Sequence, residues 1–281
     1  SSRIVFTGGG TGGHFYPLIA VAQGIEDACM EKTLIEPELY YVGPKAFDVA
    51  ALQEHDIIHL QSSAGSLRAG GSSFNPLGAL KTASGIMHAI GQMYSLYPDV
   101  VFSTGGYAAF PTLVAARILR IPTVIYDADA SPGRVSLWAA KFARWIGVAH
   151  PDAAAHFPAK YRSRIARVGH PIRKEIMAPA KEGGYEFLKL DTTVPTIFIL
   201  GGSQGAKAIN DTVLDVLPDL VSRYNVIHQA GSANLTEVSG IASVVLKESQ
   251  WKDRYRSFGL LNTLAIRMSA GIADVIIARA G

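Results

Sequence analysis

The amino-acid sequence predicts an α/β protein that contains two doubly wound parallel-sheet domains. Three observations carry this prediction: the chain has 281 residues, short apolar or β-branched runs alternate with longer helical patterns, and the alternation restarts after a Pro-containing segment. Short strands separated by helical segments are typical of βαβ units, whose parallel sheet is buried on both faces. Because one core rarely grows beyond about 250–300 residues, we expect two domains.

The first alternation predicts strands at 3–7, 39–43, 57–61, 99–103, 123–127, 145–149 and 165–169. The second predicts strands at 196–200, 225–229, 255–258 and 274–278. We therefore expect an N-terminal domain at 1–169, a hinge at 170–194 with Pro171, Pro179 and Gly183-Gly184, and a C-terminal domain at 195–281. The second domain is short for this fold, and a further helix should follow its last strand. The pattern thus predicts a C-terminally truncated domain.

Composition excludes several classes of protein. The 48% hydrophobic fraction and 17% charged fraction are typical of a folded chain and exclude general disorder. The 26 basic and 23 acidic residues are nearly balanced, so no nucleic-acid partner is expected. Cys29 is the single cysteine, which allows neither an intramolecular disulfide nor a zinc cluster and indicates a reducing compartment. No apolar run of about 20 residues and no signal peptide is present, so we expect a cytoplasmic protein.

A glycine-rich loop follows the first predicted strand. Its residues Gly8, Gly10 and Gly13 satisfy the GxGxxG pattern and lead into a helix that we expect from about Tyr16-Pro17. Glycines at a helix start let backbone N–H groups approach a phosphate, so an anion site is predicted. A nicotinamide site would also need an acidic residue after the second strand, where 40–44 has none. An oxidoreductase is therefore disfavoured.

His14 ends this glycine run. An imidazole at that place could take a proton from an acceptor hydroxyl near neutral pH, which would make it a general base. A structural role is the alternative, since an isolated histidine more often has one.

Two further glycine turns follow later strands. The segment 201–206 reads Gly-Gly-Ser-Gln-Gly-Ala and leads into a helix expected near 208–217, so it repeats the first motif in the second domain. One anion site in each domain suits a donor diphosphate and a phosphorylated acceptor. The third turn, 103–107, carries Gly105-Gly106-Tyr107, and a simple tight turn is its alternative interpretation.

Five motifs occur in order along the chain: the loop 9–14 with Pro17, then 105–107, 169–173, 201–206 and 273–281. In this order they resemble the MurG family, within glycosyltransferase family 28. The resemblance implies a GT-B fold and a hexosyltransferase that inverts the sugar carbon. It also implies the reaction: transfer of N-acetylglucosamine from UDP-N-acetylglucosamine to undecaprenyl-diphosphate-linked N-acetylmuramyl-pentapeptide, in peptidoglycan synthesis for cell-wall biogenesis, cell shape and cell division.

The resemblance also implies roles for individual residues, with no cofactor and no metal. His14 would be the general base on the acceptor. The acceptor diphosphate would be bound by Thr11, Gly12, Gly13, Gly105, Gly106 and Tyr107. The donor would be bound by Asp129, Arg173, Gly202, Ser203, Gln204 and Gly205, with Arg173 as a cation beside the leaving UDP.

The chain departs from the family pattern after the fifth strand. The family usually has His-Glu-Gln-Asn there, whereas this chain has Tyr126-Asp127-Ala128-Asp129, so an expected amide is Asp129. Asp127-Ala128-Asp129 also spells DxD, a metal motif of another glycosyltransferase fold, but a parallel α/β pattern is not that fold. The family residues that specify the donor sugar would lie beyond Gly281.

The segment 76–98 has Lys81 as its only charged residue and an apolar stripe at helical spacing: Leu77, Leu80, Ile86, Met87, Ile90, Met93 and Tyr94. The stripe is either core or, with Arg68 and Lys81 beside it, an interfacial patch. The family's acceptor lies in the membrane, which implies a peripheral location on the inner face of the plasma membrane.

Two alternative functions stay open: a GT-B transferase for another lipid acceptor, such as a glycolipid synthase, and a catalytically incomplete nucleotide-sugar-binding fragment.

Overall fold

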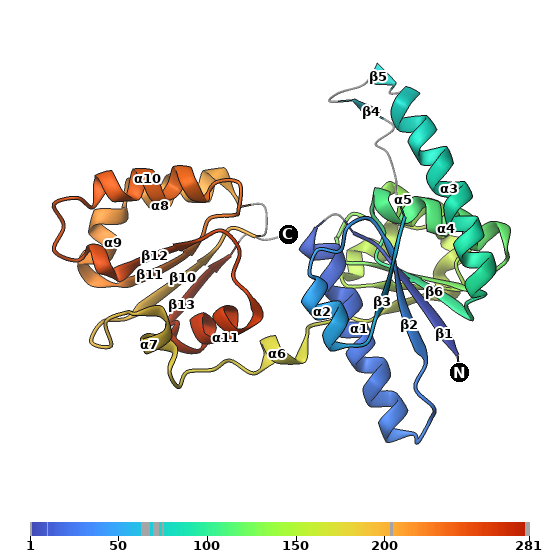
Figure 1. Ribbon diagram of the computed structural model, residues 1–281, viewed down its shortest axis with the longest axis horizontal. Helices are drawn as coiled ribbons and strands as arrows, with labels where there is room; N and C mark the ends of the chain where they lie inside the picture. The colour runs from blue at the N-terminus through green and yellow to red at the C-terminus, as the bar shows by residue number, and fades with distance from the viewer. Residues whose placement is uncertain are drawn as a thin grey trace. The chain divides into compact units, whose positions relative to one another are not determined.

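The computed structural model describes residues 2–9, 11–62, 68–69, 73–74, 76–202 and 205–278, with the backbone alone for 68–69, 73–74 and 76–81. The chain divides into two compact units, Ser1–Arg173 and Lys174–Gly281 (Figure 1). Each unit is built on a parallel sheet with helices on its faces, as the alternating sequence pattern predicts. The boundary between the units falls inside the segment 170–194 for which a hinge is expected.

The sheet of unit 1 has the order β3-β2-β1-β6-β7-β8-β9, and every neighbouring pair is parallel. The chain order reverses between β1 and β6, which is the switch point where ligands bind in doubly wound folds. All seven predicted strands are present, within one to two residues at their ends. They are β1 Arg3–Thr7, β2 Glu38–Gly43, β3 Ile58–Gln61, β6 Val100–Ser103, β7 Thr123–Asp127, β8 Trp145–Val148 and β9 Ile165–Arg167.

Helices cover both faces of this sheet. One core joins α1 (Gly12–Glu31) and α2 (Val49–Glu54) to β1 and β2 through side chains such as Phe15, Leu18 and Tyr41. The other core joins α3, α4 and α5 to β1 and β6–β8. The remaining elements are α3 Pro76–Leu96, α4 Phe110–Ile118, α5 Arg134–Ala139, the 3-10 turns Tyr107–Ala109, Pro151–His156 and Ala159–Arg164, and the antiparallel pair β4 Arg68–Ala69 and β5 Ser73–Phe74.

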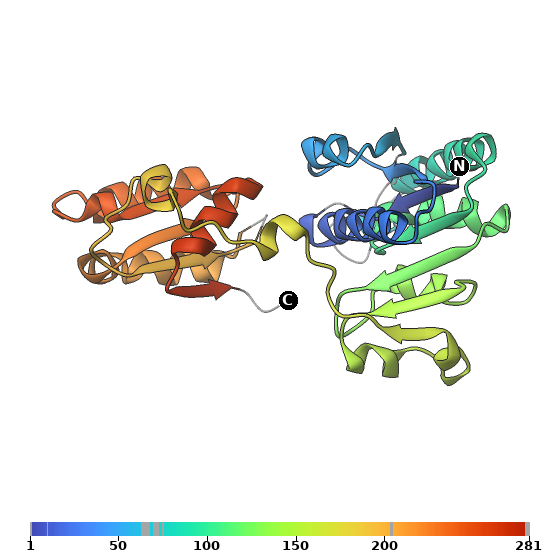
Figure 2. The same cartoon turned by 90° about the horizontal axis from the view of Figure 1, so that it is seen from below.

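Unit 2 has a sheet of order β12-β11-β10-β13, again parallel throughout. Helices α8, α9 and α10 pack on one face, and α7 and α11 pack on the other (Figures 1 and 2). The strands agree closely with the predicted ones: β10 Thr196–Leu200, β11 Asn225–Gln229, β12 Tyr255–Phe258 and β13 Val275–Ala278. The helices are α6 Lys174–Met177, α7 Gly184–Leu188, α8 Lys207–Asp215, α9 Leu217–Arg223, α10 Leu235–Val245 and α11 Thr263–Ile272, with a 3-10 turn at Lys252–Arg254.

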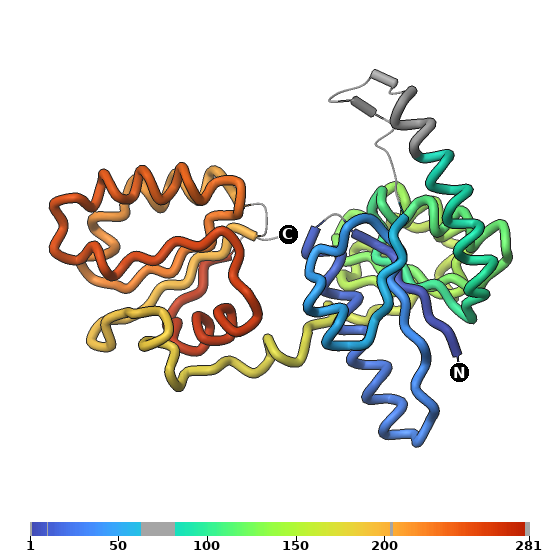
Figure 3. The backbone as a smooth tube through the Cα atoms, viewed as in Figure 1, coloured from blue at the N-terminus to red at the C-terminus, as the bar shows by residue number. Residues whose placement is uncertain are grey.

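Much of the segment expected to be a hinge packs against unit 2. Helix α7 lies on α11, a Cβ on Gly184 would stand 2.7 Å from the Ile272 side chain, and Ala180 N–H donates to the Arg267 carbonyl at 3.0 Å. Figure 3 traces this part of the backbone into β10. The segment therefore belongs structurally to the second unit from Lys174 onward.

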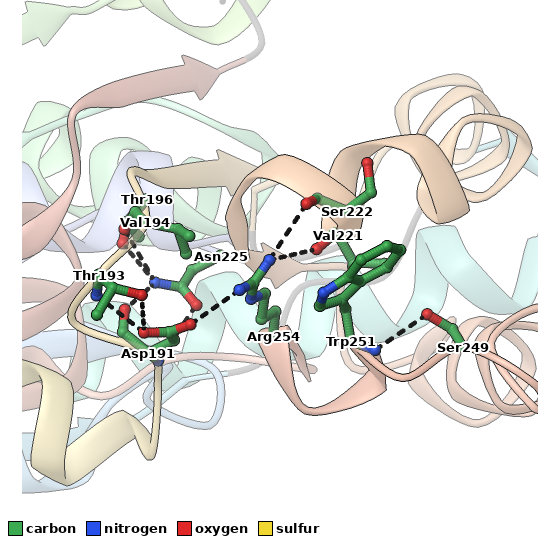
Figure 4. A network of polar contacts seen from close by, with 10 residues as sticks. All are labelled: Asp191, Thr193, Val194, Thr196, Val221, Ser222, Asn225, Ser249, Trp251 and Arg254. Carbon is green, nitrogen blue, oxygen red and sulfur yellow. Dashed lines mark hydrogen bonds and ion pairs between the residues drawn. The ribbon is translucent and has the colours of Figure 1, made fainter.

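A polar network holds the amino end of the unit 2 sheet (Figure 4). The buried Asn225 amide donates to the carbonyls of Asp191 and Val194 and to the hydroxyl of Thr196. The Arg254 guanidinium pairs with the Asp191 carboxylate at 2.9 Å, and hydrogen bonds from Thr193 and Arg254 lower the pKa of Asp191. These contacts lie at the strand starts, so they fix the sheet without occupying the opposite end, where ligands bind in such folds.

The helix expected from Tyr16-Pro17 begins earlier, at Gly12, so that boundary was wrong. Thr11 has an extended backbone, and its carbonyl accepts hydrogen bonds from the N–H groups of His14 and Phe15. Pro17 lies inside the helix rather than in its first turn. The loop is therefore shorter than predicted, and His14 lies in the first helical turn.

The apolar stripe of 76–98 is divided by the fold. Met93 is fully buried and Ile90 packs against the core, whereas Met87 and Tyr94 are each 69% exposed. The side chains of Leu77, Leu80 and Lys81 lie outside the described residues. In the described part of the chain, no helix is both long and apolar enough to cross a membrane.

Candidate functional site

In unit 1 the predicted acceptor-site residues meet at the carboxyl ends of adjacent strands. Strands β1 and β6 pair in register from Ile4 with Val100 to Thr7 with Ser103, so the loops that follow them emerge side by side. The Thr104 N–H donates to the Thr7 carbonyl at 3.1 Å and extends this pairing by one residue. The glycine loop before α1 and the turn at Gly105-Gly106 thus form one surface.

His14 is held by the turn after β6. Its Nδ1 lies 2.9 Å from the Thr104 carbonyl oxygen, and the Thr104 hydroxyl donates back to the His14 carbonyl at 2.7 Å. A carbonyl can only accept, so Nδ1 carries the hydrogen, and in the neutral ring Nε2 is the nitrogen with a free lone pair. The His14 side chain is half-buried. This arrangement suits a base whose acceptor atom is Nε2.

Gly106 lies directly against this imidazole. A Cβ at Gly106 would stand 3.5 Å from His14 Nε2 and 3.3 Å from the Gly9 carbonyl oxygen. Its φ of +80° is also in the region that favours glycine. The backbone turn therefore requires glycine, and a Cβ there would be tight against the Gly9 carbonyl and in van der Waals contact with the imidazole. Tyr107, the next residue, is 60% exposed.

The first turn of α1 supplies backbone donors. The Thr11 carbonyl accepts hydrogen bonds from the N–H groups of His14 and Phe15. The N–H groups of Gly12 and Gly13 come before these first helical bonds, so the helix itself provides no acceptor for them. Gly12 is buried against Phe47, whereas Gly13 is exposed. The helix is 20 residues long, and the positive end of its dipole is at this turn. An anionic group is stabilised at such a place.

Asp127 and Asp129, which spell the DxD pattern, have different environments. Asp127 is 5% exposed, and its carboxylate accepts from the N–H groups of Asp129 and Gly133 and from the Ser136 hydroxyl. Burial raises the pKa of Asp127, and these hydrogen bonds partly oppose the increase. Its carboxylate therefore organises the loop after β7. Asp129 is exposed, and its expected role toward the donor stays a prediction. The described residues contain no cluster of three or more metal-ligating side chains.

Arg173 is the last residue of unit 1 and is 7% exposed. Its guanidinium carbon lies 3.7 Å from the centroid of the Tyr16 ring, a close cation–π contact. The Tyr16 hydroxyl donates to Asp48, which caps the start of α2. The Arg173 guanidinium is thus buried against α1, on the ring of the residue two positions after His14. Its expected role beside UDP stays a prediction.

In unit 2 the glycine loop follows β10. Gly202 and Gly205 have φ values of +84° and +78°, and the Gly205 N–H donates to the Gly202 carbonyl. A Cβ at Gly205 would collide with the Ala230 carbonyl and the Asn234 side chain, so this loop packs tightly against the segment after β11. Ser203 and Gln204, two of the predicted donor-site residues, lie outside the described residues.

A buried polar group that the sequence did not single out supports this loop. His228 is fully buried, its Nε2 donates to Asn210 Oδ1 at 3.0 Å, and its Nδ1 accepts from the Tyr255 hydroxyl at 2.9 Å. The Asn210 amide in turn donates to the Ala230 carbonyl. Burial lowers the pKa of His228 to about 4, so the ring is neutral at pH 7. The one sequence signal was a histidine in an apolar strand, and this signal does not distinguish a structural histidine from one that binds a ligand or takes part in catalysis.

The two units together have the GT-B fold of nucleotide-sugar glycosyltransferases. The N-terminal domain of glycosyltransferase family 28 matches residues 4–148, and the C-terminal domain of that family matches residues 196–281. The chain belongs to glycosyltransferase family 28 and is a glycosyltransferase.

Two curated relatives have the same assigned name, UDP-N-acetylglucosamine--N-acetylmuramyl-(pentapeptide) pyrophosphoryl-undecaprenol N-acetylglucosamine transferase. The protein of Treponema denticola is 30% identical over 99% of this chain and 72% of its own length. One of Bacillus cereus, numbered 2, is 31% identical over 99% of this chain and 74% of its own length.

Solved structures agree on the fold. The crystal structure of Acinetobacter baumannii MurG has a TM-score of 0.63 and 24% identity, over all of this chain and 74% of that one. A putative UDP-N-acetylglucosamine 2-epimerase of Listeria monocytogenes has a TM-score of 0.70 at 14% identity, over all of this chain and 75% of that one. The resemblance that the motifs predicted is confirmed at the level of family and fold.

Proposed function

We propose that this chain transfers N-acetylglucosamine from UDP-N-acetylglucosamine to undecaprenyl-diphosphate-linked N-acetylmuramyl-pentapeptide, with inversion at the sugar carbon. The names of relatives at 30–31% identity over 99% of the chain support this substrate pair. The observation that carries the chemistry is the tautomer of His14, whose Nδ1–H bond to Thr104 leaves Nε2 as the basic nitrogen.

In the proposed reaction His14 Nε2 takes the proton of the acceptor hydroxyl. The hydroxyl oxygen then attacks the sugar carbon from the face opposite UDP, and the bond between that carbon and the diphosphate oxygen breaks as UDP leaves with the electron pair. Negative charge grows on the diphosphate in a transition state of oxocarbenium character. Neutral imidazole is the form this step needs.

We propose that the glycine loops divide the two phosphate-bearing substrates. Thr11, Gly12 and Gly13 at the start of α1, together with Gly105, Gly106 and Tyr107, take the acceptor diphosphate. The loop from Gly202 to Gly205, with Ser203 and Gln204, takes the donor phosphates. Support comes from the backbone N–H groups at the start of α1 and from positive φ at Gly105, Gly106, Gly202 and Gly205. We propose Arg173 as the cation beside the leaving UDP, held against α1 by its contact with the Tyr16 ring.

The test compares His14→Ala with His14→Gln in transfer of radiolabelled sugar to the lipid acceptor. We expect turnover to fall by about 10²–10⁴-fold in both variants, while calorimetry with UDP-N-acetylglucosamine gives an unchanged affinity. His59→Ala, a half-buried histidine of β3 in the same unit, is the matched control. Retained turnover in the His14 variants contradicts the base assignment. Transfer to diacylglycerol but not to the muramyl lipid contradicts the proposed acceptor.

We propose further that the protein acts on the inner membrane surface through α3. Its exposed Met87 and Tyr94 lie on one helix whose described part has no charged side chain between 82 and 96. An exposed apolar helix face can insert into a lipid headgroup region. Met87→Glu with Tyr94→Glu should lower binding to anionic vesicles in flotation several-fold, whereas Met177→Glu, at a 69% exposed residue of unit 2, should not. Equal losses in both would contradict a specific face.

A further inference from the structure

Two histidines meet at the carboxyl ends of the last two strands of unit 1. His150 follows β8 and His170 follows β9, and these strands are parallel neighbours. Their Nε2 atoms are 3.2 Å apart, and the rings are inclined at 72° with centroids 5.0 Å apart. The proposed transfer reaction uses neither residue.

From this geometry we propose that His150 and His170 form a two-histidine site for a divalent transition-metal ion such as Zn²⁺. Imidazole nitrogens bind Zn²⁺ at about 2.0–2.1 Å in tetrahedral geometry, so two ligand nitrogens on one ion are about 3.4 Å apart. The observed separation of 3.2 Å is close to this value, and the hydrogen bond that joins the two Nε2 atoms would be replaced by a bond from each of them to the ion. His170 is exposed and His150 is half-buried, so water can complete the coordination.

The hydroxyl of Tyr126 determines which nitrogen of His170 carries the hydrogen. The Tyr126 hydroxyl donates to the Gly169 carbonyl at 3.2 Å and lies 3.4 Å from His170 Nδ1. Because its single hydrogen is used on the carbonyl, the phenol oxygen accepts from His170 Nδ1–H, and Nε2 keeps the lone pair that a metal requires.

The position of the site indicates what a bound ion would do. His170 lies three residues before the boundary between Arg173 and Lys174, in the segment that leaves β9. A shared ion would tie this segment to the loop after β8 and stabilise the end of unit 1. The proposal is independent of the proposed transfer reaction, whose base is assigned to His14.

Calorimetry with ZnCl₂ alone, after chelator treatment, tests the site. We expect one equivalent bound at pH 7.5, with an affinity lowered about tenfold or more in His150→Ala and in His170→Ala. His156→Ala, at an exposed histidine of the same unit, is the matched control and should bind as the parent does. Tyr126→Phe should weaken binding by a smaller factor, because it removes only the acceptor of the Nδ1 hydrogen.

A spectroscopic measurement distinguishes this site from scattered binding to the eight histidines of the chain. Co²⁺ in place of Zn²⁺ should produce visible d–d bands that vanish in the double variant His150→Gln/His170→Gln. Circular dichroism of the same variant shows whether the fold is retained. Equal Zn²⁺ affinity in the double variant and the parent, or weak binding with no defined stoichiometry in the parent, overturns the proposal.

Discussion

The glycine loops of the two units differ in the groups that they carry. The loop of unit 1 ends in the imidazole of His14, whereas the described residues of the unit 2 loop are glycines and an alanine, which offer only backbone groups. In unit 1 the loop leads into a 20-residue helix, and His14 in its first turn is oriented by the Thr104 carbonyl of the adjacent turn. In unit 2 the loop leads into the nine-residue α8, and its polar support, from His228 through Asn210 to Ala230, is buried beneath it. Similar strand-loop-helix sequences therefore differ in what they offer a substrate, and we propose base chemistry for the loop of unit 1 and anion binding for the loop of unit 2.

Within this comparison of the two loops, the largest effect is expected from a change in the turn beside the base in unit 1. Gly106→Ala would place a Cβ 3.5 Å from His14 Nε2 at a backbone φ of +80°. We expect turnover to fall by about 100-fold or more, because small displacements of reacting groups cost that much, with donor affinity unchanged in calorimetry. Gly24→Ala in α1, where a Cβ meets nothing within 4 Å, is the control. A fully active Gly106→Ala protein would contradict the site geometry.

The corresponding change in unit 2 should affect folding and donor binding together. Gly205→Ala would drive a Cβ into the Ala230 carbonyl at a φ of +78°. We expect a loss of about 3 kcal/mol in the free energy of unfolding, measured by urea denaturation, and loss of UDP-N-acetylglucosamine binding. Gly240→Ala in α10 has open space for its Cβ and should leave both unchanged or improved. If Gly205→Ala binds the donor with unaltered affinity, the loop does not form part of the donor site.

A third prediction uses the buried histidine of unit 2. Burial lowers the pKa of His228 from 6.5 to about 4. Between pH 4 and pH 6.5, the unfolded chain therefore binds a proton at this residue and the folded chain does not. Stability is complete above pH 6.5 and is lost as pH falls toward 4, by about 2 kcal/mol between pH 7 and pH 5. Urea denaturation at the two pH values measures it. His228→Gln should reduce this dependence, and an equal pH dependence in the variant would assign it to other groups.

The smallest effect concerns the support of α1 in unit 1. Tyr16→Leu removes the ring beneath Arg173 and the bond to Asp48, whereas Tyr16→Phe removes only the hydroxyl. We expect a loss of about 1–2 kcal/mol in unfolding free energy for Tyr16→Leu and less than about 1 kcal/mol for Tyr16→Phe, by thermal denaturation. Equal losses would show that the cation–π contact contributes nothing. A fall in UDP affinity in Arg173→Met without a stability loss would support the donor role predicted from sequence.

Most of the fold could be predicted because parallel strands buried on both faces are short apolar runs, and the runs at 123–127, 196–200 and 225–229 match their strands residue for residue. The start of α1 could not, because a proline favours the first turn of a helix, whereas here the Thr11 carbonyl accepts the first helical bonds and Pro17 lies in the second turn. The burial of Arg173 could not be predicted either, because it depends on a contact with Tyr16, which is far away in sequence.

By itself the sequence determined the family, the two parallel-sheet domains and the residues from which the site is drawn, since motif order and strand patterns are local properties of the chain. Only the tertiary structure decided which nitrogen of His14 is basic, that Asp127 points into the protein, and that His150 meets His170. The two histidine contacts join residues 90 and 20 positions apart, and Asp127 is buried by the packing of the loop after β7, so no local pattern encodes them.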